Sequence, residues 1–417
     1  MDTSVFERYE SEVRSYCRSF PTVFSRAKGS ILTDSEGRDY IDFFCGAGAL
    51  NYGHNNGYIK RRIIEYMEND GVIHALDMYT EAKSDFIDFF EKQVLIPRGL
   101  DYKIQFPGPT GTNAVEAALK LARKVKGRSG IFALMGAFHG MTLGALSLTT
   151  DAGSRKGAGV PLGNVTHIPA PYMFEGLDVV KYMQTLLDDD HSGVEKPAAL
   201  IIETVQAEGG IYVFDNEFLR GAEKFCRDND ILLIVDDIQV GCARTGTYFS
   251  FERAGIVPDI AVLSKSIGGY GMPFSLVLLK PELDKWQPGE HNGTFRGYQP
   301  SIVAAKAGLE VMLGEHVEER VRRAGGLFSE FMEKELKPMD ERIVTRGIGC
   351  IWGVDFAGFE KDTSLRVMRE CFKNGLIVER VGRANSVVKL MPQLLISDDE
   401  LLGGLEILKK SVAACIG

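Results

Sequence analysis

Hydrophobic residues in the middle of the chain occur in short runs that alternate with longer segments of helical period. The run 231–235 contains only apolar residues, which is typical of central parallel strands covered by helices on both faces. From about residue 100 this alternation predicts an α/β fold with a mostly parallel central sheet between helices. We expect strands over 103–106, 131–134, 198–205, 231–235, 260–263 and 274–279, and helices over 112–126 and 216–227.

The two ends of the chain follow other patterns. Residues 31–43 predict two short strands joined by a turn at Gly37, which together form a small hairpin. After about residue 300 a helical pattern over 301–313 continues to Leu336 and leads to a region of mixed helices and strands. We therefore expect a smaller α+β region at the C-terminal end of the chain.

Composition disfavours several kinds of partner. The chain has 417 residues, enough for more than one packed core, and its formal net charge of −9 disfavours nucleic acid and anionic membranes. The sequence does not open on a basic region followed by an apolar stretch, and no apolar run has membrane-spanning length. We therefore expect a cytoplasmic protein with no membrane partner.

Cysteine and histidine usage predicts neither a disulfide framework nor a metal centre. The seven cysteines are scattered and form no Cys-x-x-Cys pair, and Cys45 lies in an apolar run that suggests a buried thiol. The seven histidines lack the spacing of metal ligands, so we expect no catalytic metal.

Segment 107–120 has the composition of an anion-binding helix start. A Gly/Pro-rich turn follows a predicted strand, and Thr112 stands at the opening of an alanine-rich helix. Free backbone N–H groups at such a start bind anions, and a single phosphate fits better than a nucleotide because the nucleotide-binding glycine patterns are missing. A plain N-cap by Thr110 or Thr112 is an equally good interpretation of this segment alone.

Two charged residues stand directly after buried strands. Asp236 ends an apolar strand at the position where α/β sheets bind ligands, and a protonated pyridinium nitrogen would compensate its charge. Lys265 follows the run 260–263 and precedes a glycine-rich turn, where desolvation lowers the pKa of an amine and makes it nucleophilic. The alternatives are a structural ion pair for Asp236 and a lysine that reaches solvent at the sheet edge for Lys265.

The order of these signals is more specific than any one of them. The helix start, an aromatic-His-Gly turn at 138–140, Asp236 and Lys265 follow one another at successive strand ends. At this point the sequence resembles the class III aminotransferases of the fold-type I pyridoxal 5′-phosphate (PLP) enzymes over nearly the whole chain. The matching segments are 110–114, 138–140, 203–210, 236–239, 264–265 and 294–297.

The resemblance implies a fold-type I PLP transferase with PLP as cofactor. In such a fold a large domain over 56–305 binds PLP, and an N-terminal segment over 1–55 joins a small domain over 306–417. Lys265 would form the Schiff base, and Asp236 would face the pyridinium nitrogen. The implied cofactor contacts are Gly111, Thr112, Phe138, His139, Glu203, Asp236, Gln239, Lys265 and Thr294.

The same resemblance implies an oligomer. Thr294 falls where the family has a threonine that reaches the cofactor phosphate of the neighbouring subunit. We therefore expect a homodimer with shared active sites. A tetramer formed from two such dimers is the alternative assembly.

Within the class, the sequence is most similar to the diaminobutyrate–2-oxoglutarate transaminases, a group that feeds ectoine biosynthesis and some siderophore pathways. The stretches that carry this similarity are 46–56, 106–117, 138–146 and 289–297. The implied reaction transfers the amino group of L-glutamate to L-aspartate 4-semialdehyde and gives L-2,4-diaminobutyrate and 2-oxoglutarate.

Two departures concern the substrate. Ornithine- and GABA-type relatives have arginines where Met141 and Lys389 stand, and a lysine lacks the bidentate geometry of an arginine. Glu208 matches a glutamate that screens such an arginine, so Glu208 and Lys389 are candidate substrate residues. A plain surface salt bridge between them is an equally good interpretation.

Rival functions remain open at this stage. An ornithine- or GABA-like aminotransferase, a PLP aminomutase or a PLP decarboxylase would use the same Asp236 and Lys265. A PLP-binding regulator would carry a fused DNA-binding domain, for which the segment before residue 30 leaves no room. A nicotinamide oxidoreductase is disfavoured because the glycine fingerprint is missing.

Overall fold

The structure of the protein, a computed structural model, describes residues 3–416. Its centre is a seven-stranded sheet in the order β4-β12-β11-β10-β7-β5-β6. All neighbouring strands are parallel except β12, which runs antiparallel to both of its neighbours. The strands are β4 (Lys103–Gln105), β5 (Ile131–Leu134), β6 (Val165–Ile168), β7 (Ala199–Ile202), β10 (Leu232–Asp236), β11 (Ile260–Ser264) and β12 (Ser275–Leu279). The predicted α/β fold with a mostly parallel sheet is confirmed.

The all-apolar strands face two hydrophobic cores. In β10, Leu232 and Ile234 pack into the core on one face of the sheet, whereas Leu233 and Val235 pack into the core on the other. This alternation explains why the run carries no polar side chain, because both faces of the strand are buried. The helices around the sheet are α4 (Gly57–Glu68), α5 (Glu81–Phe90), α6 (Gly111–Lys126), α9 (Val179–Asp188), α10 (Asn216–Asp228) and α11 (Gln299–Gly314).

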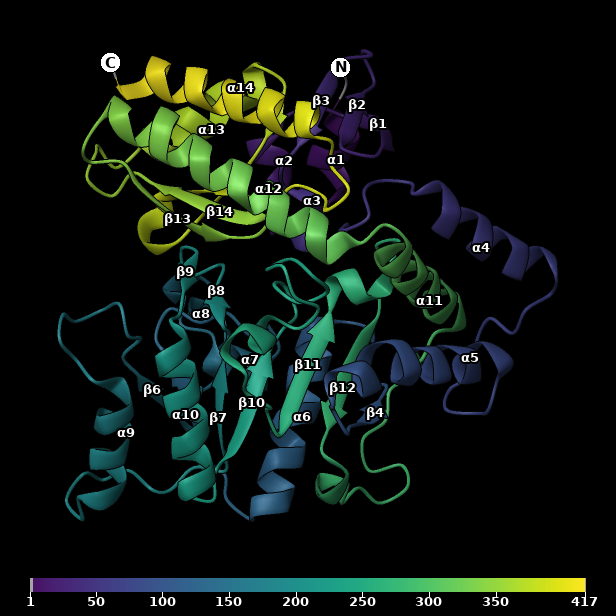
Figure 1. Ribbon diagram of the computed structural model, residues 1–417, viewed down its shortest axis with the longest axis vertical. Helices are drawn as coiled ribbons and strands as arrows, with labels where there is room; N and C mark the ends of the chain where they lie inside the picture. Colours follow the sequence, from purple (N-terminus) through teal and green to yellow (C-terminus); the bar gives the residue numbers. More distant parts are fainter. Residues whose placement is uncertain (1–2, 417) are drawn as a thin grey trace.

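Segments from both ends of the chain lie together above this sheet (Figure 1). Strands β2 (Ile31–Asp34) and β3 (Asp39–Asp42) form the predicted hairpin, with β1 (Phe24–Lys28) paired to β2. On its other side β3 pairs in parallel with β15 (Leu376–Ile377). The N-terminal strands are therefore hydrogen-bonded to the C-terminal region. The domain boundaries at residues 55 and 305 stay a prediction, and residues 1–2 and 417 of the expected parts lie outside the described residues.

The C-terminal region combines a second sheet with helices, as the sequence pattern predicts. The sheet has the order β13-β14-β17-β16. Its strands are β13 (Val344–Ile348), β14 (Ile351–Asp355), β16 (Glu379–Val381) and β17 (Val387–Leu390), and the helices are α12 (Val317–Phe331), α13 (Thr363–Lys373) and α14 (Asp398–Ile416). The shorter elements of the chain are α1 (Ser4–Tyr9), α2 (Tyr16–Ser19), α3 (Cys45–Gly48), α7 (Leu143–Leu148), α8 (Ala152–Lys156), β8 (Val205–Gln206) and β9 (Tyr212–Val213).

The long helix expected after residue 300 is interrupted. Helix α11 ends at Gly314, and His316 takes a left-handed conformation with a φ of 50° before α12 begins. A side chain with that φ cannot continue a right-handed helix. The break lets α11 pack on α4 and α5 while α12 lies with the C-terminal helices (Figure 1).

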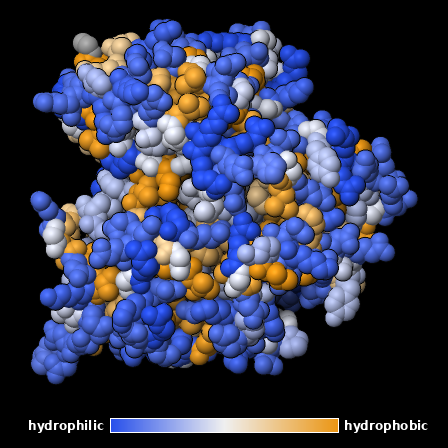
Figure 2. Space-filling model, in the orientation of Figure 1, coloured by the Kyte–Doolittle hydropathy of each residue, from blue (hydrophilic) through white to orange (hydrophobic). Residues whose placement is uncertain are grey.

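The face of the molecule drawn in Figure 2 is mostly hydrophilic. Figure 2 shows one face on which polar residues dominate and apolar residues occur in small groups. Within residues 3–416 we find no helix whose length and apolar character would let it span a membrane.

One buried arginine connects three parts of the chain. Arg244 follows β10 and has no exposed surface. Its guanidinium donates to the carbonyl oxygen of Cys350 at 3.0 Å, to that of Pro392, and to the side-chain oxygen of Asn51. Since burial of a polar group is costly without such partners, these bonds fix the C-terminal region and the N-terminal segment against the central sheet.

We predict that Arg244→Met lowers the free energy of unfolding by about 2–4 kcal/mol, because it leaves buried acceptors without a donor. Denaturant titration measures this change. Arg62→Met is the matched control, because the Arg62 side chain is 45% exposed and pairs with Glu65 on the surface, and its loss should cost less than about 0.5 kcal/mol. Equal effects of the two substitutions would contradict the prediction.

Candidate active site

A cavity of about 270 Å³ opens at the carboxyl ends of the parallel strands. Open α/β sheets bind ligands at this edge, because the loops that follow parallel strands all meet there. Nine of the eleven predicted site residues line the cavity: Gly111, Thr112, Phe138, His139, Glu203, Glu208, Asp236, Gln239 and Lys265. The structure thus brings together residues that lie far apart in the sequence.

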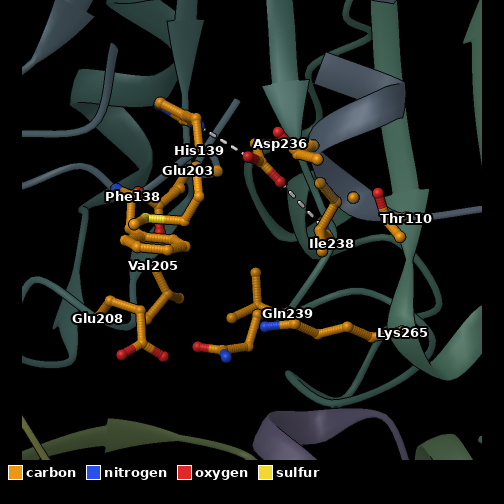
Figure 3. Close-up of a pocket in the computed structure, with 15 residues that line it drawn as sticks. Thr110, Phe138, His139, Glu203, Val205, Glu208, Asp236, Ile238, Gln239 and Lys265 are labelled. Atoms are coloured by element: carbon orange, nitrogen blue, oxygen red, sulfur yellow. Dashed lines mark hydrogen bonds and ion pairs between the residues drawn. The ribbon is translucent and has the colours of Figure 1, made fainter. Parts of the chain in front are cut away.

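Asp236 lies at the end of β10 and is 4% exposed. Its Oδ2 is 2.7 Å from Nδ1 of His139, and its Oδ1 accepts the backbone N–H of Ile238 at 3.1 Å (Figure 3). Burial lowers the pKa of His139, but the hydrogen bond and the negative charge of Asp236 outweigh it, so the pKa is raised above its ordinary value. His139 therefore favours the protonated form and compensates the charge of Asp236 through this contact.

Glu203 is a second buried carboxyl at a strand end. It follows β7, is 7% exposed, and accepts the backbone N–H of Phe138 at 3.0 Å, which fixes the start of the 138–140 turn. Burial is the largest influence and raises the pKa of Glu203 to about 7. Burial likewise raises the pKa of Asp237, the residue after Asp236, to about 7. The cavity wall at Glu203 is therefore an environment in which negative charge is costly.

Lys265 reaches the cavity from the end of β11. Its backbone has a φ of 54°, a left-handed conformation that is uncommon for a residue with a side chain. Among the described residues its amine has no hydrogen-bond or ion-pair partner. Burial lowers its pKa, and this effect exceeds the opposing influence of Glu208. The arrangement makes an unpaired, partly dehydrated amine available in the cavity.

The start of α6 closes one end of the cavity. Thr110 occupies the N-cap position but makes no side-chain cap, so the simple N-cap interpretation is wrong for this residue. Thr112 instead shares a 2.6 Å hydrogen bond with the hydroxyl of Thr142. Gly140 permits this close packing, because an added Cβ would lie 2.5 Å from the Thr112 hydroxyl. At this helix start the N–H groups of Gly111 and Thr112 have no acceptor within the helix, which leaves them available to an anion.

A cluster of charges lies beside the cavity. Lys389 on β17 is 1% exposed, and its amine is 2.5 Å from Oε1 of Glu208 and 2.9 Å from Oε2 of Glu379. Burial alone would lower the pKa of Lys389, but the two carboxylates raise it. The hydroxyl of Tyr16 donates to Glu379 at 2.9 Å. The Glu208–Lys389 pair therefore exists, and the burial of Lys389 rules out a plain surface salt bridge.

The structure also adds residues that the sequence did not single out. Ile238 and Val205 line the cavity, and Figure 3 shows Ile238 on the side opposite Phe138, with open space between them. Ile238 lies within the matching segment 236–239, so this segment could have identified it as a cavity residue. No local pattern marks Glu379 or Tyr16. Thr294 does not line this cavity, and it lies exposed on the loop before α11.

Comparison with known proteins gives a full-length match. The family model described as aminotransferase class-III matches residues 14–412. The chain is 53% identical to a diaminobutyrate–2-oxoglutarate transaminase of Streptomyces coelicolor, over 99% of this chain and 98% of the relative. It is 49% identical to a protein of the same name from Halalkalibacterium halodurans, over 100% and 97% of the two chains.

Solved structures have the same fold. The ornithine aminotransferase of Toxoplasma gondii superposes with a TM-score of 0.86 at 26% identity, over 99% of this chain and 94% of that one. In that structure PLP partly occupies the active site. A Bacillus anthracis aminotransferase superposes with a TM-score of 0.89 at 23% identity, over 99% and 100% of the two chains.

We predict that Glu203 lowers the free energy of unfolding in a pH-dependent way. Below about pH 4.5 this carboxyl is protonated in the folded and unfolded states, and between about 4.5 and 7 only the folded state holds the proton. Stability therefore falls as the pH rises through this window. Glu203→Gln should match the wild type near pH 4.5 and exceed it by up to about 3 kcal/mol at pH 8.

Urea unfolding at the two pH values, with protein freed of bound small molecules, measures this difference. Glu217→Gln is the control, because Glu217 is exposed on α10, and it should leave the pH dependence unchanged. A Glu203→Gln profile parallel to that of the wild type would show that Glu203 is ionised like an exposed carboxyl.

Proposed function

The chain belongs to the class III aminotransferase family, and we propose that it transfers the amino group of L-glutamate to L-aspartate 4-semialdehyde. The products are L-2,4-diaminobutyrate and 2-oxoglutarate. This proposal rests on one observation: about half of the residues, over the full length of the chain, are identical to those of relatives named diaminobutyrate–2-oxoglutarate transaminase. The cavity with its unpaired lysine at the sheet edge is consistent with the chemistry of an aminotransferase.

Pyridoxal 5′-phosphate is the cofactor of this family, and the residues at the cavity fit it. The space between Phe138 and Ile238 suits a flat ring (Figure 3). The helix start at Gly111 suits a phosphate. The side-chain oxygen of Gln239 is buried and has no hydrogen-bond partner among the described residues, as expected of a group that faces a ligand.

PLP, when bound, supplies an aldehyde that condenses with amines and a ring that accepts negative charge from the neighbouring carbon. In our proposal the amine of Lys265 holds the cofactor covalently. Asp236 keeps a proton on the ring nitrogen, because a buried carboxylate favours a cation beside it. His139 is a positioning residue that orients Asp236 through their 2.7 Å hydrogen bond.

The same lysine moves the proton of the reaction. Nζ of Lys265 would remove the proton from the amine-bearing carbon of the donor, and in the return direction it would deliver a proton to the acceptor carbon. The lowered pKa of Lys265 favours this role, because it increases the share of neutral amine that can accept a proton. Gly111, Thr112, Glu203 and Gln239 are proposed as further cofactor contacts.

We extend the proposal to the assembly and the location. Thr294 is exposed on its loop, and the neighbouring Phe295 is 59% exposed, which suits a segment that meets a second copy of the chain. A homodimer in which Thr294 completes the partner's phosphate site, with further pairing into a tetramer, remains our proposal. A cytoplasmic location is part of the same proposal.

The substrate proposal predicts a specific product. Purified enzyme with PLP, L-glutamate and L-aspartate 4-semialdehyde should form L-2,4-diaminobutyrate and 2-oxoglutarate in equal amounts, measured by chromatography. Omission of the amino acceptor should stop turnover after one equivalent of 2-oxoglutarate. A preference for ornithine or GABA as amino donor would overturn the assignment, and turnover without any keto acid or aldehyde acceptor would indicate a mutase or decarboxylase.

The residue roles predict distinct losses. Lys265→Ala should abolish the absorbance band of covalently held cofactor and lower kcat by at least about 10³-fold, because both the covalent link and the proton carrier are lost. Asp236→Asn should keep the covalent band but lower kcat by about 10²–10⁴-fold, because the ring nitrogen loses its anionic partner. Absorbance spectra and steady-state rates measure these effects. An unchanged band in Lys265→Ala would disprove the role of Lys265.

A further inference from the structure

The cations around the cavity differ in what neutralises them. The charge of Lys389 is shared by Glu208 and Glu379, so this cluster has two carboxylates for one amine. Arg155 donates to three backbone carbonyl oxygens. Among residues 3–416, Arg383 has no carboxylate partner, and its side chain is exposed.

Arg383 lies close to Glu208. It stands on the turn between β16 and β17, and the N–H of the preceding Gly382 donates to the carbonyl oxygen of Glu208 at 2.9 Å. Arg383 lines a second cavity, of about 450 Å³, whose lining includes Phe138 and Glu208. These two residues also line the cavity with Lys265. The two cavities therefore adjoin, with Lys265 in one and Arg383 in the other.

A stack of aromatic rings holds the guanidinium in place. The rings of Tyr172 and Tyr212 stack with centroids 3.5 Å apart and planes 5° from parallel. Arg346 lies over Tyr212, and Arg383 lies 5.3 Å from the ring centroid of Tyr172. Arg346 is paired with Asp355 at 2.7 Å, whereas Arg383 donates only to the Tyr172 hydroxyl, at 3.3 Å. Most of its five N–H donors are therefore available to a ligand.

The proposed substrates share one geometric feature. In glutamate the side-chain carboxylate carbon lies three bonds from the carbon that carries the reacting amine. In aspartate 4-semialdehyde the carboxylate carbon also lies three bonds from the reacting aldehyde carbon. One cation at a fixed distance from the reaction centre can therefore bind a carboxylate in both half-reactions.

We propose that Arg383 binds this distal carboxylate of the amino donor and of the amino acceptor. The inference rests on the proposed function, since it takes glutamate and aspartate 4-semialdehyde as substrates. A guanidinium binds a carboxylate through two parallel hydrogen bonds and stays charged at all relevant pH values. Lys389 does not serve this purpose, because it is buried and neutralised by two carboxylates that repel an anion.

The test compares two amino donors with the holoenzyme. L-glutamate carries the distal carboxylate, whereas L-2-aminobutyrate has the same reacting end without it. In Arg383→Gln, the single-turnover efficiency with glutamate should fall about tenfold to a hundredfold, because charge-assisted hydrogen bonds are lost. The efficiency with 2-aminobutyrate should stay within about twofold. With glutamate, the efficiency of Arg383→Lys should lie between the efficiencies of Arg383→Gln and the wild type.

Arg366→Gln is the matched control, because it removes one positive charge from the same region at an exposed site paired with Glu360. It should change neither rate. Equal losses with both donors in Arg383→Gln, or no loss with either, would overturn the proposal. Equal losses would place Arg383 at the reacting end or in a structural role.

A binding measurement separates this inference from the proposed function. Calorimetry should show that glutarate, an unreactive dicarboxylate, binds the Arg383→Gln holoenzyme about tenfold or more weakly than the wild type. If the wild type does not accept glutamate as donor, the proposed function fails, whereas weaker glutarate binding would still support the anchor. If diaminobutyrate forms normally but glutarate binds both proteins equally, the anchor proposal fails and the function stands.

Discussion

The parallel alignment of β5, β7, β10 and β11 is the constraint on which the site depends. Because these strands run in one direction, their carboxyl ends meet at one sheet edge, and the residues that follow them converge there. This edge brings His139, Glu203, Asp236 and Lys265 to one cavity although they span more than a hundred positions of sequence. The antiparallel β12 contributes no residue to that lining. Arg244 then fixes the C-terminal region above the same edge, so that β17 supplies Lys389 beside the cavity.

Burial makes each charge in this region depend on its neighbours. Asp236 is buried beside a histidine that favours its protonated form, and Lys389 is buried between two carboxylates. Glu203 has no such cation in direct contact, and its pKa rises to about 7 as a result of burial. Among residues 3–416, Lys265 likewise has no carboxylate in direct contact, and burial lowers its pKa. An uncompensated amine in a cavity is expected where a site is organised for a ligand.

The local sequence pattern was sufficient to predict the strands, the hairpin at 31–43 and the order of the motif residues. These features follow from short-range periodicity and from residue types that stand next to strand ends. The break at His316 was missed, because a left-handed φ at a histidine has no strong sequence signal. The partners of Lys389 were predicted only in part: Glu208 stands in a recognisable segment, whereas Glu379 and Tyr16 meet it through tertiary packing alone. The role that we propose for Arg383 could not be predicted from the sequence either. It depends on tertiary packing that leaves this guanidinium without a carboxylate partner among the described residues.

The absence of arginine at positions 141 and 389 is explained by the charges that surround the cavity. A buried cation between Glu208 and Glu379 stabilises two carboxylates but presents no positive charge to an incoming anion. A guanidinium on the neighbouring turn, stacked on Tyr172 and exposed, pays a smaller desolvation cost when a carboxylate arrives than a buried one would. With Arg383 as the residue that binds the carboxylate, the region is positive at Arg383 and negative where Glu208 and Glu379 surround Lys389. A ligand that carries both an ammonium group and a carboxylate, as aspartate 4-semialdehyde does, matches this polarity, whereas a simple diamine leaves the guanidinium without a partner.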